Sequence, residues 1–295
     1  MSTQPVPAPA PTARASSPWH ESWRVFRSNR AAVFGLALMT ALIALMLAGP
    51  GLYGVKAFDI VAEPFTAPFL DPKVWLGTDY LGRDVLAGIL IGGRATLLVG
   101  LASAALAVAI GVTVGAMAGF YGGWVDALLT RLIELFQVLP ALLLAMVLVS
   151  LFSPSLQVVV FAIGIVAWTS TARLARAEFM RLRHLEYVNA ARTMGAGALR
   201  LMLREILPNA LPPLIVSATL IIGSAILFEA GLSFLGLSDA NVMSWGMMIG
   251  NNRRNVLDCW WAVTFPGLAI FATVLAVSLI GDGLNDAFNP KLQLR

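Results

Sequence analysis

The sequence predicts an all-α protein that crosses a membrane six times. Of its 295 residues, 58% are hydrophobic and only 12% are charged. Soluble domains carry about 25% charged residues, and the excess apolar surface of this chain would aggregate in water. Long apolar runs recur along the chain, and about 20 apolar residues suffice to cross a bilayer as a helix. We therefore expect the lipid bilayer to be a partner of this chain.

Six apolar segments separated by polar links define the expected spans. They cover about residues 31–49, 96–120, 128–152, 158–171, 213–228 and 265–280. The first is expected to be a retained span, because its apolar core and the polar region before it are too long for a cleaved signal peptide. Pro140 interrupts the third segment and predicts a kink. Three glycines four residues apart share one face of the second and predict close helix packing: Gly111, Gly115 and Gly119.

The placement of basic residues predicts the orientation of the spans. Lysine and arginine concentrate in cytoplasmic loops. With the N-terminus inside, the N-tail, the 121–127 turn, the 173–205 loop and the C-tail hold most of the basic residues. We therefore expect both termini in the cytoplasm. Because the charges gather near span ends rather than along one polar face, we expect no nucleic-acid partner.

The chain divides into four expected parts. Residues 1–18 are rich in Pro, Ala, Ser and Thr and predict a disordered cytoplasmic tail. Residues 19–92 hold the first span and an extracytoplasmic segment, residues 93–286 hold five spans, and residues 287–295 form a second cytoplasmic tail. Within the extracytoplasmic segments, some residues have local expectations. Gly77 and Gly82 suit turns, Asp79 or Asp84 could cap a helix, and three tryptophans suit a membrane interface: Trp245, Trp260 and Trp261.

The residues predict no catalytic centre, metal site or cofactor. The single cysteine, Cys259, is expected to be buried or unreactive, and His20 and His184 lie far apart. No phosphate-binding loop is present. Glu134 and Glu229 are the deepest acidic residues, expected as interfacial groups or local hydrogen-bond partners, with a gate role for Glu229 as a hypothesis. The nearly uncharged spans disfavour a self-contained channel or secondary transporter, and a scaffold or membrane enzyme lacks supporting residues. A partner must then supply the energy for transport.

The 173–205 loop carries seven arginines yet keeps helical apolar periodicity. We expect two short helices joined by a sharp bend. Gly195 would close the first in the left-handed conformation, and the second would stop before Pro208. Tyr187, Ala191 and Gly195 would share one face of the first helix. Such a helix could seat in a groove of another protein, or the loop could be a basic segment touching lipid headgroups.

This loop resembles the signature of the permease subunits of ABC importers, which is Glu-Ala-Ala, three residues, Gly, and a later Leu-Pro. The chain matches it with Asn189-Ala190-Ala191, Gly195 and Leu207-Pro208. Asn189 replaces the usual glutamate, and Glu186 lies one turn earlier. Further segments, in the same order, are similar to the C-type permeases of dipeptide, oligopeptide and nickel importers: residues 76–85, 228–237, 244–246, 265–271 and 281–286. The resemblance covers about residues 19–292.

The resemblance implies a type I ABC importer permease fold in a bacterial plasma (inner) membrane. It implies a non-catalytic subunit that imports peptides, with nickel chelates or another small solute as alternatives. The implied partners are a second homologous permease, two ATPase subunits and an extracytoplasmic substrate-binding protein. The resemblance also implies which residues form the ATPase-coupling loop: Glu186, Tyr187, Asn189, Ala190, Ala191, Gly195, Leu207 and Pro208.

Overall fold

The computed structural model describes residues 18–288, with side chains from residue 22 onward. Apart from two isolated β-bridges, the described residues form helices, turns and irregular links. This confirms the predicted all-α class. The residues that would form most of the two predicted tails, 1–17 and 289–295, lie outside the described part of the chain.

Five helical stretches are long and apolar enough to cross a membrane. They are α2 (Arg30–Tyr53), α3 (Val85–Tyr121), α6 (Leu156–Leu182), the continuous stretch Ala198–Phe234 and α11 (Trp261–Ala287). A sixth candidate consists of α4 (Gly123–Val138) and α5 (Ala141–Phe152), which are bent by 86° relative to each other. The described residues thus hold five candidate spans, or six if this bent pair counts as one.

The break between α4 and α5 lies where the sequence predicts a kink, but it is a full interruption. Leu139 adopts an extended conformation, with φ −79° and ψ 131°. Pro140 follows it and lacks the N–H group that would continue the ladder of helical hydrogen bonds. The two half-helices can therefore point in different directions, whereas the halves of a kinked helix remain one continuous helix.

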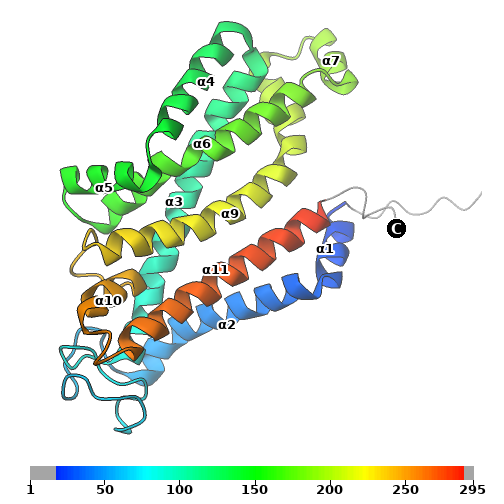
Figure 1. Cartoon of the computed structure of the whole chain (residues 1–295). Helices are drawn as coiled ribbons and strands as arrows, with labels where there is room; N and C mark the ends of the chain where they lie inside the picture. The colour runs from blue at the N-terminus through cyan, green and yellow to red at the C-terminus, as the bar shows by residue number, and fades with distance from the viewer. Residues whose placement is uncertain (1–17, 289–295) are drawn as a thin grey trace, which may run out of the picture.

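The helices pack as a slanted bundle (Figure 1). α3 packs along α6, α2 packs along α11, and α9 (Leu207–Phe234) contacts α3, α6 and α11. One end of the bundle, the α7 end, carries α1 (Pro18–Ser28) and α7 (Glu186–Thr193). The opposite end, the α10 end, carries the irregular segment 54–84 and α10 (Trp245–Asn252).

Several spans are longer than their apolar cores indicate. α3 begins at Val85 because the carboxylate of Asp84 accepts hydrogen bonds from the N–H groups of Leu86 (2.7 Å) and Ala87 (3.2 Å). The division expected between residues 92 and 93 therefore falls inside α3. α6 continues to Leu182, so that about the first third of the expected 173–205 loop is helical and packed on the bundle.

The glycine face of α3 packs directly against α6. A methyl group at Gly111 would lie 2.6 Å from Cβ of Thr171, and one at Gly115 would lie 2.3 Å from the carbonyl oxygen of Ala172. At Gly119 the nearest atom, a carbonyl oxygen of α6, would be 2.5 Å away. These distances confirm the predicted close approach of another helix.

The segment 76–85 forms tight turns at the α10 end. Gly77 and Gly82 have φ of +76° and +80°, as their predicted role in turns requires. Asp84 caps α3, whereas Asp79 caps no helix. The carboxylate of Asp79 instead accepts hydrogen bonds from the N–H groups of Leu81 (2.8 Å) and Arg83 (2.9 Å), which closes the turn.

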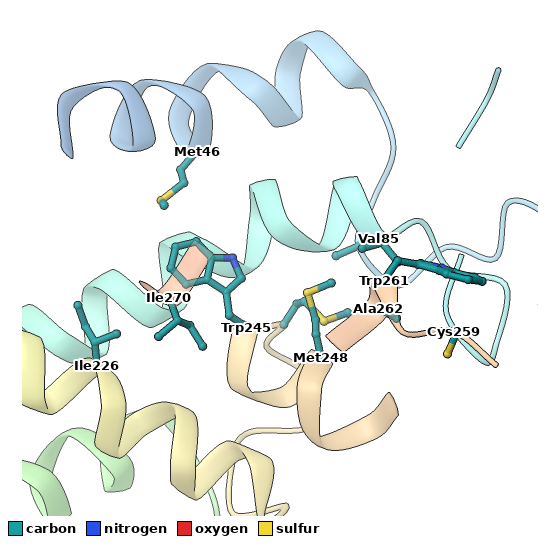
Figure 2. Packing of buried hydrophobic residues seen from close by; sticks show 11 residues of the cluster. Met46, Val85, Ile226, Trp245, Met248, Cys259, Trp261, Ala262 and Ile270 are labelled. Carbon is teal, nitrogen blue, oxygen red and sulfur yellow. The ribbon is translucent and has the colours of Figure 1, made fainter. Parts of the chain in front are cut away.

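The interfacial location predicted for three tryptophans is wrong for two of them. Trp245 and Trp261 are buried in the core of the α10 end, while Trp260 is half exposed. Figure 2 shows the Trp245 ring between Met46 and Ile270. The indole N–H groups donate to Ile89 O (2.9 Å, from Trp245) and Thr78 O (3.0 Å, from Trp261). Segment 54–84 and α10 cover these side chains, and Cys259 is fully buried beside them, as predicted.

Candidate functional site

α7 is a short helix held outside the spans, between α6 and the Ala198–Phe234 stretch (Figure 1). Glu186 lies in its first turn and Arg192 in its last, so both charges complement the helix dipole. The chain enters it through a tight link, in which the N–H group of Leu185 donates to Leu182 O (3.1 Å). The link leaves α7 little freedom to move independently of α6.

The C-terminus of α7 is closed by Gly195, whose φ of +85° lies in the left-handed region. The N–H group of Gly195 donates to Arg192 O (3.0 Å), and that of Ala196 donates to Ala191 O (3.1 Å). This pair of hydrogen bonds is the Schellman arrangement, which favours glycine because other residues are strained there. The predicted left-handed closure at Gly195 is confirmed.

The two faces of α7 differ in burial. Val188 and Ala191 are buried and pack against a cluster that contains Phe179, Leu201 and Ile206. The three residues predicted to share one face therefore form no single docking surface: Ala191 is buried against the bundle, Tyr187 is exposed, and Gly195 lies beyond the end of the helix. The face left exposed carries four residues of the expected coupling set: Glu186, Tyr187, Asn189 and Ala190.

The second helical run does not stop before Pro208. Residues Leu201–Ile206 form a π-helical turn that continues directly into α9, with Leu207 half-buried against the α7 cluster and Pro208 exposed. In a regular α-helix the ring of Pro208 would collide with the carbonyl group four residues earlier, at Arg204. The wider π turn relieves this collision. α7 is thereby joined rigidly to a span.

Further contacts fix the base of α7 to other helices. The guanidinium group of Arg183 donates to the carbonyl oxygens of Gly119 (2.9 Å) and Phe120 (3.1 Å) at the end of α3. The hydroxyl group of Tyr187 donates to Glu205 O (3.4 Å). The amide group of Asn189 donates to His184 O (3.3 Å), within the same segment. A force applied to α7 would thus reach α3, α6 and α9 together.

The two acidic residues that the sequence places deepest have different environments. Glu134 is exposed and pairs with Arg131 (2.8 Å). Glu229 is buried on α9, where one carboxylate oxygen accepts a hydrogen bond from Ser233 (2.7 Å) and the other has no partner among the described residues. It is a local hydrogen-bond partner, as expected, but it is enclosed within the bundle.

Within the described residues, no group of three or more His, Cys, Asp or Glu side chains could hold a metal ion. The fold defines the class of protein: a polytopic helical membrane protein in which the short helix α7 is anchored to the bundle outside the spans. The family model described as "Binding-protein-dependent transport system inner membrane component" matches residues 111–294. A second model, "N-terminal TM domain of oligopeptide transport permease C", matches residues 17–72. The chain belongs to this family of binding-protein-dependent, ABC-type permease components.

Curated relatives align along nearly the whole chain. The di/tripeptide transport system permease protein DppC of Pseudomonas aeruginosa is 40% identical, over 98% of this chain and 97% of its own length. The dipeptide transport system permease protein DppC of Alkalihalophilus pseudofirmus is 37% identical, over 97% and 94%. That of Bacillus subtilis is 36% identical, over 92% and 86%. These matches confirm the family resemblance that the sequence motifs indicate.

A solved structure supports the fold. The inward-facing MetNI methionine ABC transporter contains a chain that superposes with a TM-score of 0.52 at 18% identity. The match covers 67% of this chain and 96% of that one. The predicted importer permease fold is therefore confirmed.

Proposed function

We propose that this chain is the non-catalytic permease subunit of an ATP-driven importer of short peptides in a bacterial plasma membrane. The full-length similarity to permeases named for dipeptide and tripeptide transport supports peptides over nickel chelates or other small solutes. The proposed partners are a second, homologous permease, two ATPase subunits and an extracytoplasmic binding protein. The importer takes its energy from the ATPase subunits.

The observation that carries the coupling role is the two-faced burial of α7. Its inner face, Val188 and Ala191, is locked into the bundle, while its outer face, including Tyr187 and Ala190, is free to seat in a groove of an ATPase subunit. A helix that is rigid on one side and open on the other can pass motion of a partner to the spans. Gly195, Leu207 and Pro208 contribute by holding the helix at its base.

The proposed orientation places the α7 end, with both termini, in the cytoplasm. This end carries most of the arginines outside the apolar cores, among them Arg181, Arg183, Arg192, Arg200 and Arg204. The α10 end carries more acidic than basic residues in segment 54–84. The positive-inside rule supports this orientation.

Co-purification tests the proposed assembly. The chain would be tagged at its C-terminus, extracted from its native membrane in mild detergent, and its companions identified by mass spectrometry. Recovery of an ATPase with a phosphate-binding loop and of a related permease is the expected result. Repeated recovery of the chain alone, in transport-competent form, would contradict the proposal and favour a self-contained transporter.

A substitution on the exposed face of α7 tests the coupling role. Ala190→Trp adds bulk where the ATPase would seat, so peptide uptake should fall about tenfold or more while membrane insertion stays normal. Ala41→Trp, at an exposed position of α2, is the matched control and should leave uptake unchanged. Wild-type uptake and ATPase binding in Ala190→Trp would rule out this docking face.

A further inference from the structure

A hollow of about 200 Å³ lies between α5, α6 and α9. Ala141 lines it from the first position of α5, Thr169 and Ser170 from α6, and Ser224 from α9. Thr169 is at the middle of α6, and most of the other residues that line the hollow, among them Ile163 and Ile221, are apolar. A water molecule occupies about 30 Å³ in the liquid, so the hollow has room for a small polar group and several waters.

The hydroxyl group of Thr169 has no hydrogen-bond partner among the described residues, although the side chain is only 8% exposed. Three threonines in other spans satisfy this group locally, since Thr40, Thr113 and Thr273 each donate to the carbonyl group four residues earlier, at 2.7–2.8 Å. The hydroxyl oxygen of Thr169 is not among the fully enclosed polar atoms of the described residues, so it stays accessible from the hollow that the side chain lines. Because Thr169 lies on the wall of the hollow, its hydroxyl group can donate a hydrogen bond to a ligand that enters the hollow.

The start of α5 supplies a second set of donors at the same place. The N-cap residue is Pro140, and no side chain caps this 12-residue helix. The first N–H groups of a helix have no partner within it, and they form the positive end of the helix dipole. The 86° break positions this uncapped end beside the middle of α6, with Ala141 on the wall of the hollow.

The unpaired hydrogen-bond donors and the lack of charged side chains around the hollow indicate which kind of ligand it can bind. Ser224 already donates to Ile221 O (2.9 Å), and no charged side chain lines the hollow. Free N–H and O–H donors beside a positive helix end favour an anionic oxygen ligand. In other transporters, the ends of broken helices near the bilayer midplane face charged groups of the substrate in this way.

We infer that this hollow binds the carboxylate group of the transported substrate during its passage through the membrane. The inference rests on the proposed function, in which short peptides carry a free C-terminal carboxylate. It assigns Thr169 and the first turn of α5 as the residues that hold this group. The carboxylate end of a peptide would then be held partway across the membrane by backbone N–H groups and one hydroxyl group, without a positively charged side chain.

The test uses the whole importer, with its ATPases and binding protein, reconstituted in vesicles. Thr169→Val removes the hydroxyl group and keeps the shape, so uptake of dialanine should fall about tenfold or more, the usual effect of losing a hydrogen bond to a charged group. Thr169→Ser keeps a hydroxyl group and should retain uptake. The ATPase activity stimulated by the loaded binding protein, and the thermal midpoint, should stay at wild-type values in both variants.

Two further comparisons separate a ligand site from a packing effect. Dialanine amide, supplied at concentrations that load the binding protein, lacks the carboxylate, so Thr169→Val should carry it at the wild-type rate. Ala141→Pro removes one N–H donor from α5, and the first helical position tolerates proline. Pro140 already has ψ 117°, which suits a residue before proline. This variant should also slow uptake of dialanine selectively.

Thr40→Val, at an exposed and locally bonded threonine of α2, is the matched control and should behave as wild type. Wild-type dialanine uptake in Thr169→Val, or an equal loss for dialanine and its amide, would overturn the site alone. Absence of dialanine uptake by the wild-type importer would overturn the proposed function, and the inferred site with it.

Discussion

The side chains of Arg176 and Asp126 form a two-pronged ion pair that joins α6 to α4. The guanidinium group donates from Nε to one carboxylate oxygen (2.5 Å) and from Nη2 to the other (2.7 Å). Both side chains are less than one-third exposed. Charge-assisted bonds of this geometry are among the strongest in proteins. The pair fixes the first half of the broken span against the helix that leads to α7.

Removal of this carboxylate should destabilise the α7 end. Asp126→Asn leaves the partly buried guanidinium group with a weaker, uncharged partner, so we expect a loss of about 1–3 kcal/mol in the free energy of unfolding in detergent. The exposed pair of Arg131 and Glu134 provides the control, and Glu134→Gln should cost less than about 0.5 kcal/mol. A double-mutant cycle with Arg176→Gln measures the pairing. Strictly additive effects would show that the pair contributes nothing.

Gly115→Ala should force α3 away from α6. The added methyl group would lie 2.3 Å from a backbone oxygen of α6, which cannot rotate away as a side chain can. We expect a destabilisation of about 1–3 kcal/mol, measured as a lower thermal midpoint in detergent. Gly267→Ala in α11 is the matched control, because nothing lies within 4 Å of its added methyl group. A midpoint for Gly115→Ala equal to that of Gly267→Ala would contradict the close packing described for this face.

Gly195→Ala should strain the end of α7 without any steric clash. No atom lies within 4 Å of the added methyl group, so the cost comes only from the left-handed backbone and should be about 1–2 kcal/mol. Peptide uptake should fall while insertion into the membrane remains normal. Gly197→Ala, two residues on, has equal space and an ordinary φ of −70°, and it should be tolerated. Equal uptake by both variants would show that the Schellman closure is unimportant for coupling.

The stability of the α10 end should depend on the ionisation of Asp79. Burial raises the pKa of this carboxyl group above its usual value of about 3.9, so the folded protein retains a proton that the unfolded chain releases. The resulting stabilisation is full below the usual pKa and is lost as the pH rises through the raised one. Asp79→Asn should flatten this dependence above about pH 4, because the amide oxygen can accept the same hydrogen bonds.

Thermal midpoints across this pH range test the Asp79 prediction. Asp71→Asn is the matched control, since Asp71 accepts a similar local hydrogen bond from the N–H group of Lys73 (2.9 Å) but is half exposed. It should leave the pH dependence of the wild type unchanged. An unaltered pH profile in Asp79→Asn would exclude Asp79 as its source.

Four features can be predicted from the amino-acid sequence alone: the membrane class, the glycine face of α3, the position of the break at Pro140 and the left-handed closure at Gly195. Each of these follows from local chemistry. Apolar length, residue spacing along a helix, the missing N–H group of proline and the backbone freedom of glycine act within a few turns of the chain. The family resemblance rests on contiguous motifs, so it too can be recognised without the fold.

Which helix faces are covered depends on the packing of the whole fold. Ala191 turns inward because α6 and the π turn meet it from the other side, and two tryptophans expected at an interface are enclosed by segment 54–84 and α10. The unpartnered hydroxyl group of Thr169 becomes significant only because the distant break at Pro140 sets an uncapped helix end beside the same hollow. The burial of a side chain and its hydrogen-bond partners depend on residues far apart along the chain, so no local sequence pattern predicts them.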